Sequence, residues 1–281
     1  MILSCLSTVS LEEVRASAPD CVLWQQVYIF RDRFLTESLV RRAAAQGFAA
    51  IVLTVDSPVP GDGVARLKYL AHLPEGLRSF ANVQASFKNI TSSTDGDHGE
   101  YPISIDSADS VTAKDLQWLC ALSELPVVVK GVLTAEAALT AYQNGAAAVM
   151  VSNHGGRQLD GTPATINALP EVVAAVGDRM EVYLDGGVRS GADVAKTLSL
   201  GARAVFVGRP VLWGLAYDGK HGVDNVLNIL REELERTIRL LGCPDTNDLC
   251  EDFVVHEDHY LRHLRCNPSR REMRVQWKSK M

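Results

Sequence analysis

The residues best suited to chemistry lie in the segment SNHGGRQLD, which starts at Ser152. His154 can accept or release a proton near neutral pH. Arg157 follows in the same glycine-flanked loop and can hold a carboxylate through two parallel hydrogen bonds. Asp56 is the candidate acid that would orient the imidazole and stabilise its charged form. This combination would suit proton transfer on a small anionic substrate, whereas a loop histidine taken alone is more often a surface residue than a base.

Two glycine-containing segments indicate an anion site. LDGGVRSGADV (184–194) and VGRP (207–210) each follow an apolar strand and precede a helix. Backbone N–H groups and a helix N-terminus at such a turn bind phosphate, and Arg189 and Arg209 would add positive charge. The alternative interpretation is that these glycines only form tight turns.

The elements that must position these groups follow a repeating pattern. Amphipathic helices end at Gly47, Gly145 and Gly201, and an apolar strand follows each of them. Continuous apolar character is typical of parallel strands buried on both faces. The predicted strands are 2–6, 22–30, 49–55, 126–130, 146–151, 181–185 and 203–208. Seven strands alternating with helices predict an α/β fold of the TIM (β/α)₈-barrel type.

Polar residues follow or end most of these strands. Gln26 and Tyr28 are two residues apart, as are Thr54 and Asp56, so each pair lies on one face of its strand. Lys130 and Asp185 end two later strands. The carboxyl ends of barrel strands meet at one rim, where the chemistry of this fold gathers. We therefore expect these side chains to converge there.

Composition excludes several classes of protein. The formal net charge of −6 disfavours nucleic-acid binding. No apolar run is long enough to cross a membrane, and the first residues lack the basic segment of a signal peptide. The six cysteines are scattered without a CxxC pair, so we expect reduced thiols and no metal site. No strand leads into a GxGxxG motif, which disfavours a dinucleotide-binding fold.

The motifs together resemble the FMN-dependent 2-hydroxy acid oxidases and dehydrogenases, the glycolate oxidase-like family. The matching segments run in the family's order: QQVYIFRDR (25–33), IVLTVDSP (51–58), LPVVVKGV (125–132), VSNHGGRQLD (151–160), VYLDGGVRSGADV (182–194) and VFVGRP (205–210). The pair SNHGGRQLD and DGGVRSG is highly specific. The resemblance implies a flavoenzyme that oxidises an L-2-hydroxy acid to a 2-oxo acid, with O₂ as acceptor giving H₂O₂.

The resemblance also implies roles for individual residues. His154 is the base at the substrate's C2 centre, oriented by Asp56, while Arg157 binds the substrate carboxylate and Tyr28 hydrogen-bonds the substrate. The residues implied to hold FMN are Ser4, Gln26, Thr54 and Lys130 at the ring system or ribityl chain, Asp185 at the ribityl hydroxyls, and Gly187, Arg189, Gly208 and Arg209 at the phosphate.

The chain departs from the family pattern in three places. The first barrel strand of the family is missing, so the barrel domain (1–244) is predicted to be incomplete at its N-terminus. The loop after Asp56 carries Asp62 and Gly63 where a basic residue is expected, with Arg66 as a substitute. Leu6 replaces the Trp of glycolate-preferring members, which predicts medium- or long-chain substrates.

The remaining segments are a long insertion and a C-terminal tail that ends in a candidate targeting signal. Residues 57–112 form a long polar insertion, and residues 245–281 form a basic tail that we expect to be partly disordered. The chain ends Ser279-Lys280-Met281, a close variant of the Ser-Lys-Leu address, so we expect recognition by the peroxisomal import receptor. The alternative is a cytoplasmic protein.

Two other interpretations remain open. One is a non-catalytic truncated fragment or isoform, which the missing first strand favours. An open barrel also exposes two edge strands, which invite pairing in a homo-oligomer. The other is a different FMN barrel, such as an isomerase, which would share the phosphate loops but would not need His154 and Arg157 in one loop.

Overall fold

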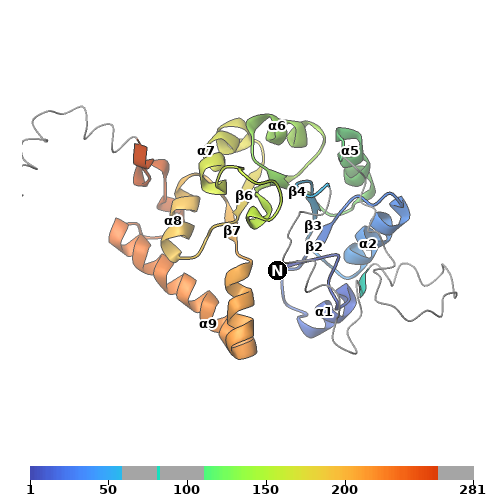
Figure 1. The fold of residues 1–281 in the computed structure, drawn as a ribbon, viewed down its shortest axis with the longest axis horizontal. Coiled ribbons are helices and arrows are strands. Elements are labelled where there is room, and N and C mark those ends of the chain that lie inside the picture. Colours follow the sequence, from blue (N-terminus) through green and yellow to red (C-terminus); the bar gives the residue numbers. More distant parts are fainter. Residues whose placement is uncertain (59–80, 83–110, 259–281) are drawn as a thin grey trace, which may run out of the picture.

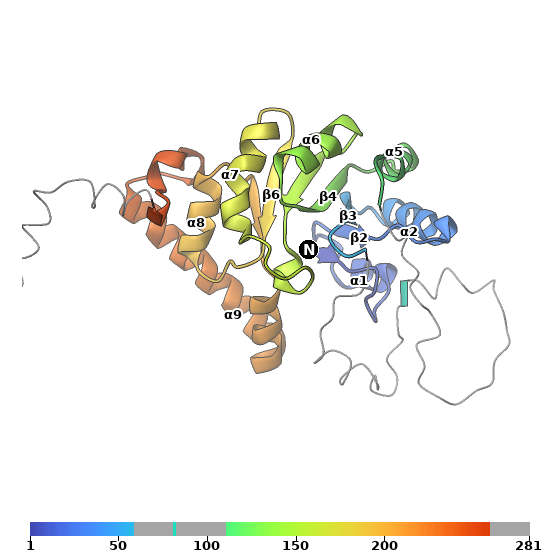
Figure 2. The ribbon, with the colours of Figure 1, turned by 45° about the horizontal axis from the view of Figure 1, so that its top comes forward.

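The fold is an alternation of parallel strands and helices, with the helices on the outside of a curved sheet (Figures 1 and 2). The computed structural model describes residues 1–58, 81–82 and 111–258. Most of the predicted insertion, with Asp62, Gly63 and Arg66, lies outside these residues, as does the C-terminal tripeptide. The strands are β1 (Ile2–Leu3), β2 (Trp24–Val27), β3 (Ala50–Thr54), β4 (Val127–Val132), β5 (Ala148–Val151), β6 (Glu181–Asp185) and β7 (Ala204–Phe206).

The helices connect successive strands. They are α1 (Leu11–Ser17), α2 (Arg33–Ala45), α5 (Ala113–Leu122), α6 (Ala135–Gln143), α7 (Thr165–Val176), α8 (Gly191–Ser199) and α9 (Arg209–Leu241), with short 3₁₀ turns at His154–Gly156, Thr246–Asp248 and Glu251–Phe253. Helix α9 is kinked at Asp218 and Gly219. Within the described residues, no helix is long and apolar enough to cross a membrane.

The sheet confirms the predicted barrel type with seven strands. Each strand pairs in parallel with the next along the chain, in the order β1 to β7. The sheet curls strongly, because Trp24 of β2 packs on Tyr183 of β6 and Phe206 of β7, at centroid distances of 5.4 and 5.3 Å. In the described part of the chain, the outer sides of β1 and β7 are unpaired.

Five of the strands, β1, β2, β3, β5 and β7, are shorter than predicted, β2 by the most. Strand β1 ends at Leu3 because Ser4 begins a turn whose carbonyl accepts the N–H of Ser7 at 3.1 Å. Strand β2 ends at Val27, and the Thr36 hydroxyl then bonds the main chain, donating to Tyr28 O and accepting from Phe30 N. These side-chain bonds satisfy main-chain groups that would otherwise have needed a sheet partner.

Local sequence signals account for the helix starts. Thr134 caps α6 by accepting the N–H of Ala137 at 3.2 Å. Ser190 and Asp193 form a reciprocal capping box at the start of α8. Such caps stabilise a helix by about 1 kcal/mol and fix where each helix begins after its strand.

Apolar residues pack on both faces of the sheet. The larger cluster joins the outer face to the helices and includes Leu39, Leu53 and Leu169. A separate cluster contains strand residues only, namely Ala50, Val52, Val128, Ala148, Met150 and Tyr183. It contains no helix residue, so it fills the concave interior of the curved sheet. This explains why the strands are apolar throughout and do not alternate.

Candidate active site

A histidine–aspartate pair lies at the carboxyl end of the sheet. His154 Nδ1 lies 2.7 Å from Asp56 Oδ1, although the two residues are 98 positions apart. Asp56 follows the end of β3, and His154 opens the 3₁₀ turn after β5. Their side chains are only 11% and 15% exposed. The contact expected between the two side chains is present, and it holds Nδ1 of the imidazole ring.

His154 has a strained backbone. Its φ is +57°, a left-handed conformation that is uncommon outside glycine, although Asn, Asp and His adopt it more often than other residues do. Its N–H donates to Ser152 Oγ at 3.1 Å, which holds the turn. Such strain costs about 1–3 kcal/mol and tends to persist at functional sites.

Lys130 lies between two carboxylates. Its Nζ is 3.6 Å from Asp56 Oδ2 and 3.6 Å from Asp185 Oδ2, and it donates to Ser152 Oγ at 3.0 Å. Among the described residues, Asp185 Oδ1 is buried yet accepts no hydrogen bond. A buried carboxylate oxygen normally has a donor. Asp185 therefore offers an acceptor to a hydroxyl-bearing ligand.

Gln26 ties the ends of the first three strands together. Its Nε2 donates to Thr54 Oγ1 at 3.0 Å, and its Oε1 accepts the N–H of Cys5 at 3.1 Å. Gln26 and Thr54 are buried polar residues, as expected of groups that face a site in the barrel mouth. Ser4 lies nearby in sequence and is exposed, and its hydroxyl accepts the N–H of Leu6.

Tyr28 presents a neutral hydroxyl beside the pair. Burial raises the pKa of Tyr28 to about 12, and the charges of Cys5 and Asp56 act in the same direction. The hydroxyl bonds Ser57, which also accepts a hydrogen bond from Gln158. Tyr28 therefore stays protonated at neutral pH and can donate to an anion.

Arg157 lies on the outer side of the histidine loop. Its Nε donates to the carbonyl oxygen of His154 at 3.2 Å, and the residue is exposed. The bond leaves the terminal guanidinium nitrogens available for a second partner. Arg157 and His154 thus lie together as predicted, with an anion-binding group and a base on one loop.

The two predicted anion-binding turns differ in their helix termini. At α8, the N–H groups of Arg189 and Ser190 donate to Asp193 Oδ2, and the N–H of Gly191 donates to Glu233 Oε2 at 2.8 Å. That N-terminus is already filled by carboxylates. At α9, Gly208 is the N-cap and no side chain caps the helix. The α9 N-terminus therefore has the positive dipole that favours an anion, although Pro210 carries no N–H and the N–H of Val211 donates to Gly208 O at 3.1 Å.

Open space surrounds one glycine of each of these turns. A Cβ added at Gly187 or Gly208 would meet no atom within 4 Å. Arg209 at the start of α9 donates to the carbonyl of Gly155, next to His154. The anion turn and the histidine loop are therefore joined by a direct hydrogen bond.

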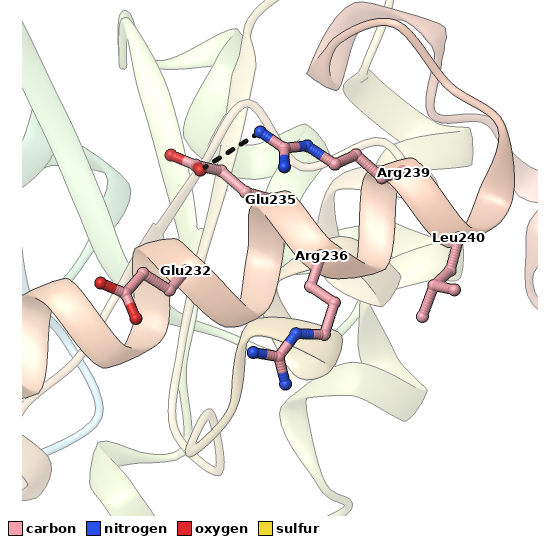
Figure 3. Close-up of a pocket in the computed structure, with 5 residues that line it drawn as sticks. All are labelled: Glu232, Glu235, Arg236, Arg239 and Leu240. Carbon is pink, nitrogen blue, oxygen red and sulfur yellow. Dashed lines mark ion pairs between the residues drawn. The ribbon is translucent and has the colours of Figure 1, made fainter.

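A separate hollow lies on α9. It has a volume of about 360 Å³ and is lined by exposed residues of this single helix, among them Glu235 and Arg239, whose charged groups are 3.9 Å apart (Figure 3). It contains none of the strand-end residues described above. The candidate catalytic residues therefore lie at the sheet and not in this hollow.

Two residues of the site were not among the predicted set. Ser152 is fully buried and links Lys130 to the main chain of His154. Ser57 links Tyr28 to Gln158. The signal for Ser152 was available in the sequence, since a hydroxyl directly after the continuous apolar strand AAAVMV is unusual unless it has a partner.

Comparisons with known proteins cover most of this chain. The family model of FMN-dependent dehydrogenases matches residues 1–256. The chain is 46% identical over 257 residues to 2-hydroxyacid oxidase 1 of Homo sapiens, covering 90% of this chain and 69% of that protein. It is 45% identical over 258 residues to L-lactate oxidase of Nostoc sp. (strain PCC 7120 / SAG 25.82 / UTEX 2576), covering 90% of this chain and 70% of that protein.

A solved structure shares the architecture. Mandelate oxidase with benzoyl-formic acid superposes with a TM-score of 0.75 at 40% identity, covering 88% of this chain and 66% of that one. The chain thus spans about two thirds of the length of the proteins it matches. The family model, the curated relatives and the shared fold lead to one conclusion: the chain belongs to the FMN-dependent dehydrogenase family.

Proposed function

We propose that this chain oxidises an L-2-hydroxy acid to the corresponding 2-oxo acid with FMN, and passes the electrons to O₂ to give H₂O₂. The substrate loses two electrons and two protons, one proton from C2 and one from its hydroxyl. O₂ takes up the two electrons and the two protons and becomes H₂O₂. The observation that carries the proposal is the 2.7 Å contact between His154 and Asp56 beside an anion-binding Arg157 on the same loop. This is a base next to a carboxylate-binding group.

The residues present fit FMN. Asp185 has a buried carboxylate oxygen without a hydrogen-bond donor among the described residues, as a site for ribityl hydroxyls requires. The uncapped start of α9 and the open space at Gly187 and Gly208 suit a phosphate. The residues that would hold the cofactor are Ser4, Gln26, Thr54 and Lys130 for the ring system or ribityl chain, Asp185 for the ribityl hydroxyls, and Gly187, Arg189, Gly208 and Arg209 for the phosphate. When bound, FMN supplies an acceptor for the two electrons of the substrate.

The side chains have complementary tasks at the substrate. Arg157 binds the carboxylate, and the neutral hydroxyl of Tyr28 donates a hydrogen bond to the substrate. His154 acts as the base that takes a proton from the substrate at its C2 centre, whether from the carbon or from its hydroxyl, and Asp56 stabilises the imidazolium that forms. Lys130 supplies positive charge where the electron-accepting ring gains negative charge.

The test is a spectroscopic titration of the purified chain. Bound flavin should show bands near ~370 and ~450 nm, as oxidised flavins do. Anaerobic addition of an L-2-hydroxy acid should bleach the band at longer wavelength, and air should restore it with release of H₂O₂. A folded chain that stays colourless with added FMN refutes the proposal.

A non-catalytic fragment or isoform is the alternative, and one observation favours it. Within the described residues, the outer sides of β1 and β7 are unpaired, so the sheet does not close. Unpaired parallel edges also favour self-association. The same titration separates the two functions, because a fragment would bind flavin weakly and would not bleach with substrate.

Leu6 supports a preference for medium- and long-chain substrates. It lies two residues after Ser4, is half-buried, and packs against the main apolar cluster. A Leu in place of an indole leaves room for a longer side chain.

We further propose delivery to peroxisomes through Ser279-Lys280-Met281. An oxidase that releases H₂O₂ suits that compartment, and the terminal tripeptide is close to the Ser-Lys-Leu address. An N-terminal fluorescent fusion should be punctate with the tripeptide and diffuse without it. Equal patterns for the two fusions would mean that these residues carry no address.

A further inference from the structure

Gly131 interrupts strand β4 at the catalytic end of the sheet. The register between β4 and β5 shifts between Lys130 and Val132, so Gly131 is the extra residue of a bulge. Its φ is +109°, a conformation that L side chains rarely adopt. A glycine in a strand often marks a bulge or a place where another segment approaches closely.

The segment that approaches is Asp56. The last bond between β3 and β4 runs from Val55 N to Lys130 O at 2.9 Å, so the next residues of the two strands lie side by side. A Cβ added at Gly131 would lie 2.6 Å from Asp56 Cβ, 2.8 Å from its Cγ and 2.8 Å from its N. Real Cβ atoms essentially never make contacts this short, so Asp56 would have to move.

That movement would affect His154. Asp56 Oδ1 is 2.7 Å from His154 Nδ1, and Asp56 Oδ2 is 3.6 Å from Lys130 Nζ. We propose that Gly131 is a positioning residue, whose missing side chain lets Asp56 approach closely enough to orient His154. The expected effect on catalysis rests on the proposed oxidation of a 2-hydroxy acid. The close approach of Asp56 to Gly131 rests on geometry alone.

A matched control separates backbone strain from contact with Asp56. Gly145 has a similar φ of +93°, but an added Cβ there would meet only Cys120, at an ordinary 3.5 Å. Gly145 lies before β5, at the opposite end of the strands. Gly131→Ala and Gly145→Ala therefore carry comparable strain, and only the first displaces Asp56.

The first readout does not depend on turnover. The bond between His154 Nδ1 and Asp56 should protect a ring proton from exchange, giving an NMR signal far downfield of the amide protons. His154→Gln assigns that signal in the holoprotein. We expect Gly131→Ala to lose it and Gly145→Ala to keep it. Retention of the signal in Gly131→Ala overturns the proposal, even if the wild-type chain oxidises no hydroxy acid.

The second readout is a double-mutant cycle on kcat/KM for a 2-hydroxy acid. A misplacement of about 1 Å can cost about 10²-fold, so we expect that loss in Gly131→Ala, mainly in kcat and with FMN retained. In the Asp56→Gly background, Gly131→Ala should cost little more. Equal losses in both backgrounds overturn the proposal.

Folding failure is also informative. If Gly131→Ala does not fold, the double variant Gly131→Ala/Asp56→Gly should recover part of the lost folding stability, because the contacts with Asp56 Cβ and Cγ are gone and only the one with its backbone N remains. If both variants fail to fold while Gly145→Ala folds, Gly131 is required for the backbone of the sheet and not for its contact with the Asp56 side chain.

Discussion

Replacing Asp56 with Asn tests the centre of the proposed mechanism. The substitution keeps the size and shape of the side chain and removes its charge. Lys130 keeps two of its partners, because its Nζ still lies 3.0 Å from Ser152 Oγ and 3.6 Å from Asp185 Oδ2. We therefore expect the fold and the flavin content to be unchanged, and the effect to fall on His154.

The size of the effect follows from the contact. Asp56 and His154 meet at 2.7 Å with side chains only 11% and 15% exposed, so solvent screens them little. A hydrogen bond to a charged partner contributes about 1.5–3 kcal/mol. At about 1.36 kcal/mol per tenfold in rate, the loss of that stabilisation as the imidazolium forms lowers kcat/KM by about 10- to 150-fold.

The assay measures the rate of anaerobic flavin reduction in a stopped-flow instrument. It isolates the step in which His154 takes the proton, and it avoids the later reaction with O₂. Asp178→Asn is the matched control, because Asp178 is 77% exposed and pairs only loosely with Arg179, at 3.5 Å. It should reduce flavin at the wild-type rate.

Two results would contradict the reasoning. The first is a flavin-loaded Asp56→Asn variant whose reduction rate falls by less than about threefold. The second is a loss of flavin that accounts for the whole fall in activity, since Asp56 would then act on the cofactor and not on His154.

Four further predictions concern the same site. His154→Gln should lower turnover by about 10²–10⁴-fold with flavin retained, and near-wild-type flavin reduction would refute the role of the base. Arg209→Ala should raise the Kd for FMN, because an arginine at the uncapped start of α9 is lost, and an unchanged Kd in a fluorescence titration would exclude this role. Because burial raises the pKa of Tyr28 from 10.0 to about 12, the folded state holds that proton more tightly than the unfolded state does. The free energy of unfolding should therefore fall as pH rises from about 10 to about 12, and less steeply in Tyr28→Phe; identical urea midpoints for the two proteins at each pH would refute this. Finally, kcat/KM for 2-hydroxyoctanoate should exceed that for glycolate, and Leu6→Trp should narrow the difference.

The sequence determined the fold class because the necessary signals are local. Apolar runs without alternation indicate strands covered on both faces, and a capping residue such as Thr134 or Ser190 marks where a helix starts. The carboxyl ends of parallel strands share one rim, so polar residues at those ends were predictable as one site. The loop with His154 and Arg157 was identifiable from residue type and spacing alone.

Strand limits were less predictable, for a physical reason. The segments 2–6 and 22–30 are apolar beyond the ladder, yet β1 ends at Leu3 and β2 at Val27. The hydroxyl of Thr36, near the start of α2, bonds the main chain after β2. Apolar character records burial, whereas the ladder depends on which partner each N–H finds.

Tertiary structure alone decided how the site is assembled. The 2.7 Å contact between His154 and Asp56 spans 98 residues, and it depends on a bulge at Gly131 that no local pattern specifies. Likewise, only the fold shows that Glu233 meets the start of α8 while α9 begins without a cap. Spacing along a chain fixes which face a side chain occupies, but distances between strands depend on register, bulges and the packing of every intervening element.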